Sequence, residues 1–250
     1  MYPAHGGRSP NIANKQQGPD VAVIIPAAGS GTRMGPGDNK VKRLVRGHPM
    51  LEWSLRCFLG VPQVRRIIVV MRNQDGDWMR DLLREMVRGF GRLSTAHVKL
   101  VVGGAERQES VFRGLQTLDD APPDWVLVHD GARPNPGRDL VGRVLEGLER
   151  NLAVVPALPV ADTLRRMGTG ETKVVDRSGL YATQTPQGFH WRILWEAHRT
   201  AHRDGVLGTD DAQLVEALGR PVHMVQGHPA NLKVTTGVDL EMMERIMTPP

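Results

Sequence analysis

The residues best suited to chemistry are glycines and cations gathered in one loop near the start of the chain. An apolar, β-branched run at residues 21–25 predicts a buried strand. The loop after it contains Gly29 and Gly31, and such small residues let backbone N–H groups approach an anion closely. Arg33 and Lys40 add positive charge at the same place. A structural turn would explain the glycines but not the two bases, so the loop predicts a phosphate site and a nucleotide ligand.

Two common phosphate-binding motifs do not fit this loop. A P-loop requires Gly-Lys followed by Ser or Thr, and the chain has no such triplet. The dinucleotide fingerprint requires G-x-G-x-x-G, whereas Gly29, Gly31 and Gly35 give G-x-G-x-x-x-G. That fingerprint also needs an acid after the second strand, where this chain has Arg72. The pattern therefore argues against a redox dinucleotide.

An acidic residue follows another predicted strand, at residues 125–129. Asp130 stands at its carboxyl end, which is where ligands bind in parallel sheets. Beside a nucleotide, its simplest role is to hold Mg²⁺, a hard ion that prefers oxygen ligands. The alternative is that Asp130 caps the turn or pairs with Arg133. Its place in the sheet favours the functional role, whereas His129 is expected to be a buried strand residue.

Two further segments carry weaker signals. Gly103 and Gly104 open a helix after a strand, and Ser110 lies one turn into that helix, so a base or ribose would fit there. A plain strand-to-helix turn explains these residues almost as well. Lys233 lies in an extended stretch from which it would reach the crevice, but a lone lysine is more often a solvated surface residue.

Size and composition limit the class of protein. With 250 residues the chain suits one α/β domain at 20–250, preceded by a Gly- and Pro-rich segment, 1–19, that predicts a disordered tail. The single cysteine, Cys57, cannot form an internal disulfide and suits a reducing, cytoplasmic location. No apolar run would span a membrane, and the net charge of +5 with 4% aromatics gives no signal for nucleic-acid binding.

Strand and helix patterns alternate along the first 155 residues. The predicted strands are 21–25, 66–71, 98–102, 125–129 and 153–155, and the predicted helices between them are 50–59, 78–87, 105–118 and 138–150. This alternation predicts an α/β fold, a Rossmann-like, mostly parallel sheet flanked by helices. The loops after the first, third and fourth strands should share one crevice, because ligands sit at the carboxyl ends of such strands.

The rhythm changes between residues 157 and 185. Two short extended runs, 160–166 and 173–177, flank a Gly-Thr-Gly turn and predict a β-hairpin arm inserted into the domain. A lone hairpin is marginally stable in water, so the arm is expected to pack on a second copy of the chain. Helices at 191–203 and 210–218, a strand at 222–225 and a last helix after Gly237 complete the pattern.

Taken together, these motifs resemble the 2-C-methyl-D-erythritol 4-phosphate cytidylyltransferases of the non-mevalonate isoprenoid pathway. The matching pieces occur in family order and are 26–34 (Pro-Ala-Ala-Gly-Ser-Gly-Thr-Arg-Met), Lys40, 127–134 (Leu-Val-His-Asp-Gly-Ala-Arg-Pro), 162–163, 175–180, 185–189, 209–212 and 231–235. The resemblance implies transfer of CMP from CTP to a sugar-alcohol phosphate with release of pyrophosphate, by a Mg²⁺-dependent homodimer whose hairpin arms clasp each other.

The resemblance also assigns roles by position. The cations expected to hold the triphosphate and the developing charge are Arg33, Lys40 and Lys233. The residues expected to hold the nucleotide are Ala27, Ala28, Gly29, Gly31, Gly103, Gly104, Ser110 and Asp130, with Asp130 also the metal ligand. The residues expected at the methylerythritol phosphate are Arg133, Thr163, Arg177 and Thr185, the last two at its phosphate, with the partner subunit's arm as one source of them.

The chain departs from the family pattern at two places. Relatives often carry an acid after the glycine pair, where this chain has Ala105, and they usually have apolar residues where this chain has Lys42 and Arg43. Lys42 is therefore an alternative to Lys40. Two other functions remain open on the sequence: a ribitol 5-phosphate cytidylyltransferase, and a non-catalytic nucleotide sensor on the same fold. Together, Arg33, Lys40, Asp130 and Lys233 argue against the sensor.

Overall fold

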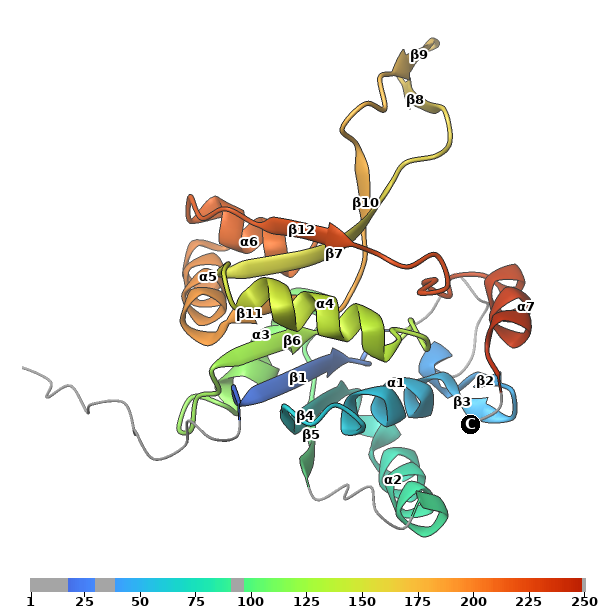
Figure 1. Cartoon of the computed structure of the whole chain (residues 1–250), viewed down its shortest axis with the longest axis vertical. Helices are drawn as coiled ribbons and strands as arrows, with labels where there is room; N and C mark the ends of the chain where they lie inside the picture. Colours follow the sequence, from blue (N-terminus) through green and yellow to red (C-terminus); the bar gives the residue numbers. More distant parts are fainter. Residues whose placement is uncertain (1–17, 30–38, 91–96, 249–250) are drawn as a thin grey trace, which may run out of the picture.

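A mixed β-sheet forms the centre of the molecule (Figure 1). The computed structural model describes residues 18–29, 39–90 and 97–248. Among these, eight strands form the sheet; in spatial order they are β10 (Tyr181–Thr183), β7 (Ala153–Pro159), β11 (Gln187–His190), β6 (Trp125–Val128), β1 (Val21–Pro26), β4 (Val64–Met71) and β5 (Val98–Val102), with β12 (His223–Gln226) beside β7. The four strands from β6 to β5 are parallel, as predicted.

Helices cover both faces of the sheet. On one face lie α1 (Met50–Leu59), α2 (Gly76–Phe90) and α4 (Arg138–Leu148), and on the other α3 (Arg107–Gln116), α5 (Trp191–Asp204) and α6 (Asp211–Ala217). Successive side chains of β1 point to opposite faces of the sheet, so both faces are apolar. Val23 packs with the first group of helices and Ile24 with the second. The α/β fold class is therefore confirmed. A last helix, α7 (Gly237–Ile246), packs on a separate small apolar cluster.

Some elements were not predicted. β10 and β11 run antiparallel to β7, and β11 also runs antiparallel to β6, so the sheet changes direction at β11. A one-turn 3₁₀ helix, η3 (Lys40–Lys42), leads into a two-stranded hairpin, β2 (Leu44–Val45) and β3 (His48–Pro49), and a second 3₁₀ turn, η4 (Asn73–Asp75), follows β4. None of the helices that the described residues form has the length and apolar character needed to cross a bilayer.

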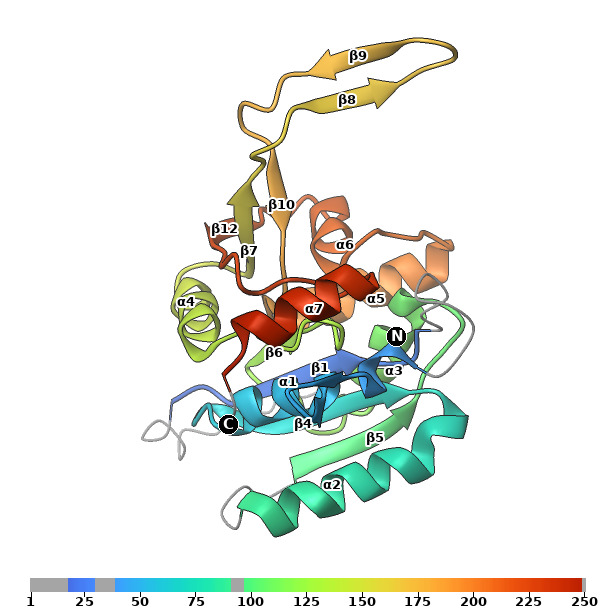
Figure 2. The ribbon, with the colours of Figure 1, turned by 90° about the vertical axis from the view of Figure 1, so that its right-hand side faces the viewer.

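The predicted hairpin forms an arm that projects from the body (Figure 2). Its strands β8 (Leu164–Met167) and β9 (Thr172–Val175) pair with each other and not with the main sheet. Met167 is 83% exposed and Val174 is 59% exposed. Packing of this arm on a second subunit stays a prediction. Most of the predicted tail, residues 1–17, lies outside the described residues.

Candidate active site

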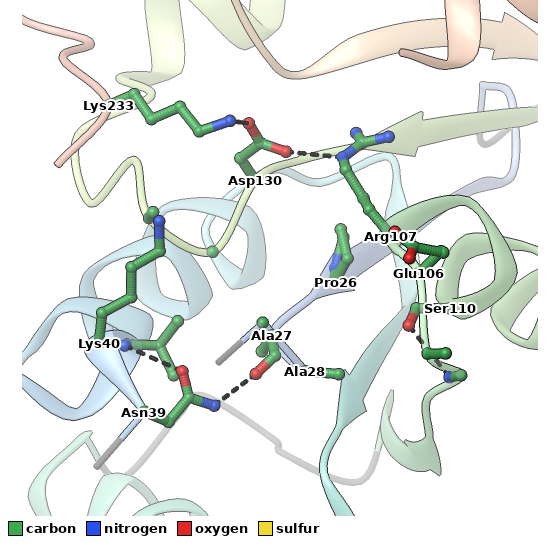
Figure 3. Close-up of a pocket in the computed structure, with 16 residues that line it drawn as sticks. Pro26, Ala27, Ala28, Asn39, Lys40, Glu106, Arg107, Ser110, Asp130 and Lys233 are labelled. Carbon is green, nitrogen blue, oxygen red and sulfur yellow. Dashed lines mark hydrogen bonds and ion pairs between the residues drawn. The ribbon is translucent and has the colours of Figure 1, made fainter. Parts of the chain in front are cut away.

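One pocket lies at the carboxyl edge of the parallel strands (Figure 3). Its wall is formed by the end of β1 and the next residues, by the start of α3 and by the turn after β6, with Lys40 and Lys233 completing it. The three loops expected to share a crevice therefore do line a common pocket. Gly31 and Arg33 lie outside the described residues, whereas Gly29 lies in the pocket wall.

Lys40 is presented by the first residue of η3. The Asn39 side chain caps this turn by accepting a hydrogen bond from the Val41 N–H, 3.4 Å away. The Asn39 amide also donates to Ala27 O at 2.5 Å and to the Asp75 carboxylate at 3.0 Å. Because Asn39 is buried, these bonds join the turn to the end of β1, and Lys40 stands at the pocket beside that strand end.

Lys42 points elsewhere. Its Nζ lies 2.8 Å from Asp75 Oδ1 and 5.2 Å from the centre of the Trp78 ring, and Lys42 is not among the pocket residues. Burial raises the pKa of Asp75, but hydrogen bonds from Arg72 and Lys42 outweigh it and hold that pKa well below its usual range. Lys42 therefore neutralises a buried carboxylate behind the turn, and Lys40 is the lysine that the turn presents to the pocket.

A chain of charges crosses the pocket at Asp130 (Figure 3). One carboxylate oxygen lies 3.1 Å from Arg107 Nε and the other 2.7 Å from Lys233 Nζ. Burial raises the pKa of Asp130, but Arg107 and Lys233 outweigh it and hold that pKa well below its usual range, so the group is ionised. The sequence also allowed an ion pair between Asp130 and Arg133. In the structure the Asp130 carboxylate instead forms its ion pairs with Arg107 and Lys233.

Arg107 is a pocket residue that sequence reasoning missed. It is the first residue of α3, and its guanidinium reaches the pocket edge from there. A cation in the first turn after a glycine-rich loop is a usable signal, since that loop follows a strand whose carboxyl end faces the crevice. Its second partner, Asp211, is 104 residues away in the chain, so no local pattern points to it.

The loop between β5 and α3 is closed by its own side chains. The Gly104 N–H donates to Ser110 Oγ at 3.2 Å and the Ala105 N–H donates to Glu109 Oε2 at 2.9 Å. At Gly103 a Cβ would lie 2.8 Å from the Ala28 Cβ, so only glycine allows this loop to approach the end of β1. Gly104, Ser110 and Ala28 line the pocket, whereas Gly103 is not among the lining residues.

A buried layer supports Asp130 from behind. The Thr185 hydroxyl accepts a hydrogen bond from the Asp130 N–H at 3.0 Å and donates to His129 Nδ1 at 3.2 Å. His129 Nε2 in turn donates to Arg133 O at 2.9 Å, and burial lowers the pKa of this imidazole to about 4. His129 is buried, as expected, but it follows β6 instead of belonging to the strand. Thr185, expected at a substrate phosphate, is buried and lies outside the pocket wall.

The segment that carries Lys233 is fixed by polar contacts to the same layer. Arg133 Nη1 donates to Asn231 O at 2.7 Å, and the Asn231 amide donates to Thr185 O at 2.8 Å. The Val234 N–H then donates to Ala132 O at 2.9 Å. Arg133 therefore braces the lysine segment and does not line the pocket, and no local pattern points to Asn231 as its partner.

The remaining predicted acceptor residues lie on the arm. Thr163 immediately precedes β8 and Arg177 follows β9, and both are exposed. Neither is among the residues that line the pocket within this subunit.

The donor set of the pocket fits a divalent cation that arrives with its ligand. No group of three or more His, Cys, Asp or Glu side chains in the described residues has the geometry of a metal site. Mg²⁺ is usually held by one or two carboxylates together with substrate phosphates and water. Asp130 offers such a carboxylate at the pocket edge, while Lys40, Arg107 and Lys233 suit polyphosphate oxygens.

Known proteins share both the sequence and this architecture. The family model IspD, described as 2-C-methyl-D-erythritol 4-phosphate cytidylyltransferase, matches residues 21–249. A protein of that name from Bacillus mycoides (strain KBAB4) is 40% identical over 226 residues, 90% of this chain and 96% of its own. One from Bacillus velezensis is 41% identical over 230 residues, 91% of this chain and 96% of its own.

Solved structures agree with the sequence comparison. The crystal structure of 2-C-methyl-D-erythritol 4-phosphate cytidylyltransferase from Thermus thermophilus superposes with a TM-score of 0.73 at 38% identity, covering 91% of this chain and 98% of that one. The 4-diphosphocytidyl-2C-methyl-D-erythritol synthase of Anaerococcus prevotii gives a TM-score of 0.77 at 29% identity, covering 91% and 97%. The chain therefore belongs to the 2-C-methyl-D-erythritol 4-phosphate cytidylyltransferase family.

Proposed function

We propose that this pocket binds CTP and transfers its cytidylyl group to 2-C-methyl-D-erythritol 4-phosphate, giving 4-diphosphocytidyl-2-C-methyl-D-erythritol and pyrophosphate. The observation that carries the proposal is the convergence of Lys40, Arg107 and Lys233 with Asp130 at the carboxyl edge of the sheet. Membership of the family gives the nucleotide and the acceptor their identities.

The chemistry needs charge stabilisation more than proton transfer. A phosphate oxygen of the acceptor attacks the α-phosphorus of CTP in line, and the bond to the bridging α–β oxygen breaks, so pyrophosphate leaves with that electron pair. No general base is needed, because a phosphate monoester is largely ionised near neutral pH. Preorganised cations around the triphosphate therefore supply most of the rate enhancement.

Each part of the pocket has a role in this scheme. Lys40, with Arg33, holds the triphosphate and the negative charge that develops on it, and Lys233 holds phosphate from the other side. The strand end at Ala27–Gly29 and the loop at Gly104 hold the cytidine. Asp130, together with the triphosphate, would hold Mg²⁺, which would neutralise charge on the phosphate oxygens.

The acceptor contacts depend on assembly. Thr163 and Arg177 lie on an exposed arm, so we propose a homodimer in which one subunit's arm reaches the acceptor site of the other. Arg133 and Thr185 act from within the subunit, behind Asp130. A single nucleotidyltransferase domain at 20–250 with its arm at 157–185, and a cytoplasmic location, complete the proposal.

The role of Lys40 gives the most direct test. Lys40→Ala removes the cation that the 3₁₀ turn presents to the pocket, so kcat should fall by about 10²-fold or more, while the Kd of CTP changes far less. The measurement is pyrophosphate release from CTP and the methylerythritol phosphate, with CTP binding followed by calorimetry. Arg43→Ala is the matched control, because Arg43 lies in the same segment, is exposed and should keep wild-type turnover.

Three outcomes would contradict the proposal. Wild-type turnover in Lys40→Ala would remove the role of this lysine. A preference of the wild-type enzyme for ribitol 5-phosphate over the methylerythritol phosphate, in an assay that offers each with CTP, would change the acceptor. Binding of CTP without turnover of either acceptor would instead indicate a nucleotide sensor.

A further inference from the structure

A second group of buried charges adjoins the pocket without being part of it. Asp211, the first residue of α6, belongs to the family-like stretch at 209–212 and is 1% exposed. One of its carboxylate oxygens lies 2.8 Å from Arg107 Nη1, and the other 3.0 Å from His198 Nε2. Burial raises the pKa of Asp211, but Arg107 and His198 outweigh it and hold that pKa below its usual value.

Arg107 is therefore bound at two separate points. Its Nε contacts Asp130 at 3.1 Å and its Nη1 contacts Asp211 at 2.8 Å. A planar guanidinium held at two nitrogens by two carboxylates cannot turn about its own axis, whereas one held at a single nitrogen can. The position of Arg107 at the pocket edge thus depends on a residue that does not touch the pocket.

We propose that Asp211 is a positioning residue for the cytidylyl transfer, which acts through Arg107 to fix the carboxylate of Asp130 at the pocket edge. The proposal rests on the proposed function, because Asp130 is useful in this way only if the pocket binds CTP. It gives a role to the stretch at 209–212, which the pocket alone leaves unexplained.

The surrounding packing keeps this connection rigid. α5 packs against both α3 and α6. Its His198 stacks on Phe112 of α3, with an angle of 7° between the two ring planes. The Gln108 side chain, next to Arg107, donates to Val206 O at 2.9 Å and accepts from the Gly208 N–H at 2.8 Å. The loop between α5 and α6 is therefore fastened to the first turn of α3, and Asp211 and Arg107 keep their mutual distance.

Stability alone is a poor explanation for a charge buried in this way. Desolvation of two ions often cancels their attraction, and apolar residues of similar volume can be as stabilising. What such a pair supplies is a fixed geometry, and the loss of a residue that supports a metal ligand typically lowers activity by about 10–100-fold. Asp211 also balances the charge, because it and Asp130 together neutralise Arg107 and Lys233.

The test compares Asp211→Asn with Asp210→Asn. Asparagine has nearly the shape of aspartate, and it fits beside His198. Among the described residues His198 Nδ1 has no hydrogen-bond partner, so the imidazole tautomer can change without losing a bond. Asp210 is the matched control: it caps α6 through the Gln213 N–H at 2.9 Å and contacts Gln187 at 2.7 Å, without touching Arg107.

We expect Asp211→Asn to lower kcat/KM for CTP by about 10–100-fold, and Asp210→Asn by less than about threefold. In an Arg107→Gln background, the further effect of Asp211→Asn should nearly vanish, because the residue through which it acts is gone. A readout independent of activity is the hydrogen exchange of the Arg107 Nε–H, followed by NMR in the nucleotide-free protein. This exchange should accelerate in Asp211→Asn and stay unchanged in Asp210→Asn.

The outcomes separate this inference from the proposed function. Wild-type kcat/KM in Asp211→Asn, or an equal loss with and without Arg107, would overturn the inference alone. A wild-type protein without cytidylyl transfer would overturn the proposed function, and the Nε–H exchange would still show whether Asp211 fixes Arg107. If Asp211→Asn does not fold, His198→Gln replaces it, with a smaller loss that must again vanish in the Arg107→Gln background.

Discussion

At the scale of single residues, the site depends on a buried polar layer that does not line the pocket. His129 is fully buried beneath Asp130, and its two ring nitrogens are used by the Thr185 hydroxyl and by Arg133 O. This arrangement suits a neutral imidazole protonated at Nε2. Asp130 is therefore held in front by two cations and behind by the Thr185 hydroxyl, which the neutral ring of His129 orients.

The neutral state of His129 predicts how stability depends on pH. Burial lowers the pKa of His129 to about 4, whereas in the unfolded chain it is about 6.5. Between these pH values the unfolded chain binds a proton that the folded protein does not. The contribution of the neutral His129 to the free energy of unfolding is therefore complete above about pH 6.5 and is lost as the pH falls toward 4. The loss should approach about 3 kcal/mol of unfolding free energy.

The check is chemical denaturation at several pH values between 7 and 4. His129→Gln lacks the buried imidazole, so its unfolding free energy should fall less steeply over this range than that of the wild type. His223→Gln is the control, since His223 is exposed and should leave the slope unchanged. Parallel curves for wild type and His129→Gln would contradict the assignment of a neutral, buried imidazole.

At the scale of elements, the pocket exists because two strand ends approach each other closely. Gly103 follows β5 and approaches Ala28, which follows β1, and a Cβ at position 103 would lie 2.7 Å from Ser110 Oγ and 2.8 Å from the Ala28 Cβ. Both neighbours line the pocket. Any side chain at position 103 must therefore push α3 away from β1 and widen the site that we assign to cytidine.

Gly103→Ala should lower stability and weaken nucleotide binding together. Overpacking of this kind costs about 1–3 kcal/mol of unfolding free energy, and the shift of α3 should raise KM for CTP. Gly142→Ala is the matched control, because Gly142 lies inside α4 with open space around its Cα and should gain about 0.5–1 kcal/mol. Denaturation and initial rates measure both effects; a Gly103→Ala protein as stable as wild type would exclude this close approach.

Local patterns account for the elements but not for their long-range partners. The runs that became β1, β4 and β5 were predictable because strands buried on both faces are continuously apolar. β11 was missed because its four residues, Gln187–His190, mix polar and apolar types without a period, although Gln187 is buried. The sequence also placed Gly29, Gly104 and Asp130 just after strands, where the structure has them, whereas Lys40 lies in η3.

The missed residues depend on tertiary contacts. The link from Arg107 to Asp211 and the contact of Arg133 with Asn231 join segments about a hundred residues apart, and no spacing rule encodes them. The resemblance to a family raised Lys233 above an ordinary surface lysine, and its contact with Asp130 gives a physical reason for that. Residue types and strand ends were thus predictable, whereas the ion pairs that orient them were not.

At the scale of the whole molecule, the arm is the feature that the body does not explain. β8 and β9 stand away from the sheet, with Met167 and Val174 largely exposed (Figure 2). An isolated two-stranded hairpin is marginally stable in water, so a packing partner is expected. A symmetric dimer offers one, and it would carry the arm residues Thr163 and Arg177 to a pocket that contains neither in its own subunit.

Complementation between two inactive variants tests this exchange. Lys40→Ala damages the pocket of a subunit and Arg177→Ala damages its arm, so each homodimer should turn over poorly. In a heterodimer of the two, purified through two different tags, one site combines an intact pocket from one subunit with an intact arm from the other. The remaining site has neither, so activity should recover to about half of the wild-type value per dimer. A heterodimer as inactive as both parents would mean that each arm serves its own subunit. A protein that sediments only as a monomer would contradict the proposal that one subunit's arm reaches the acceptor site of another.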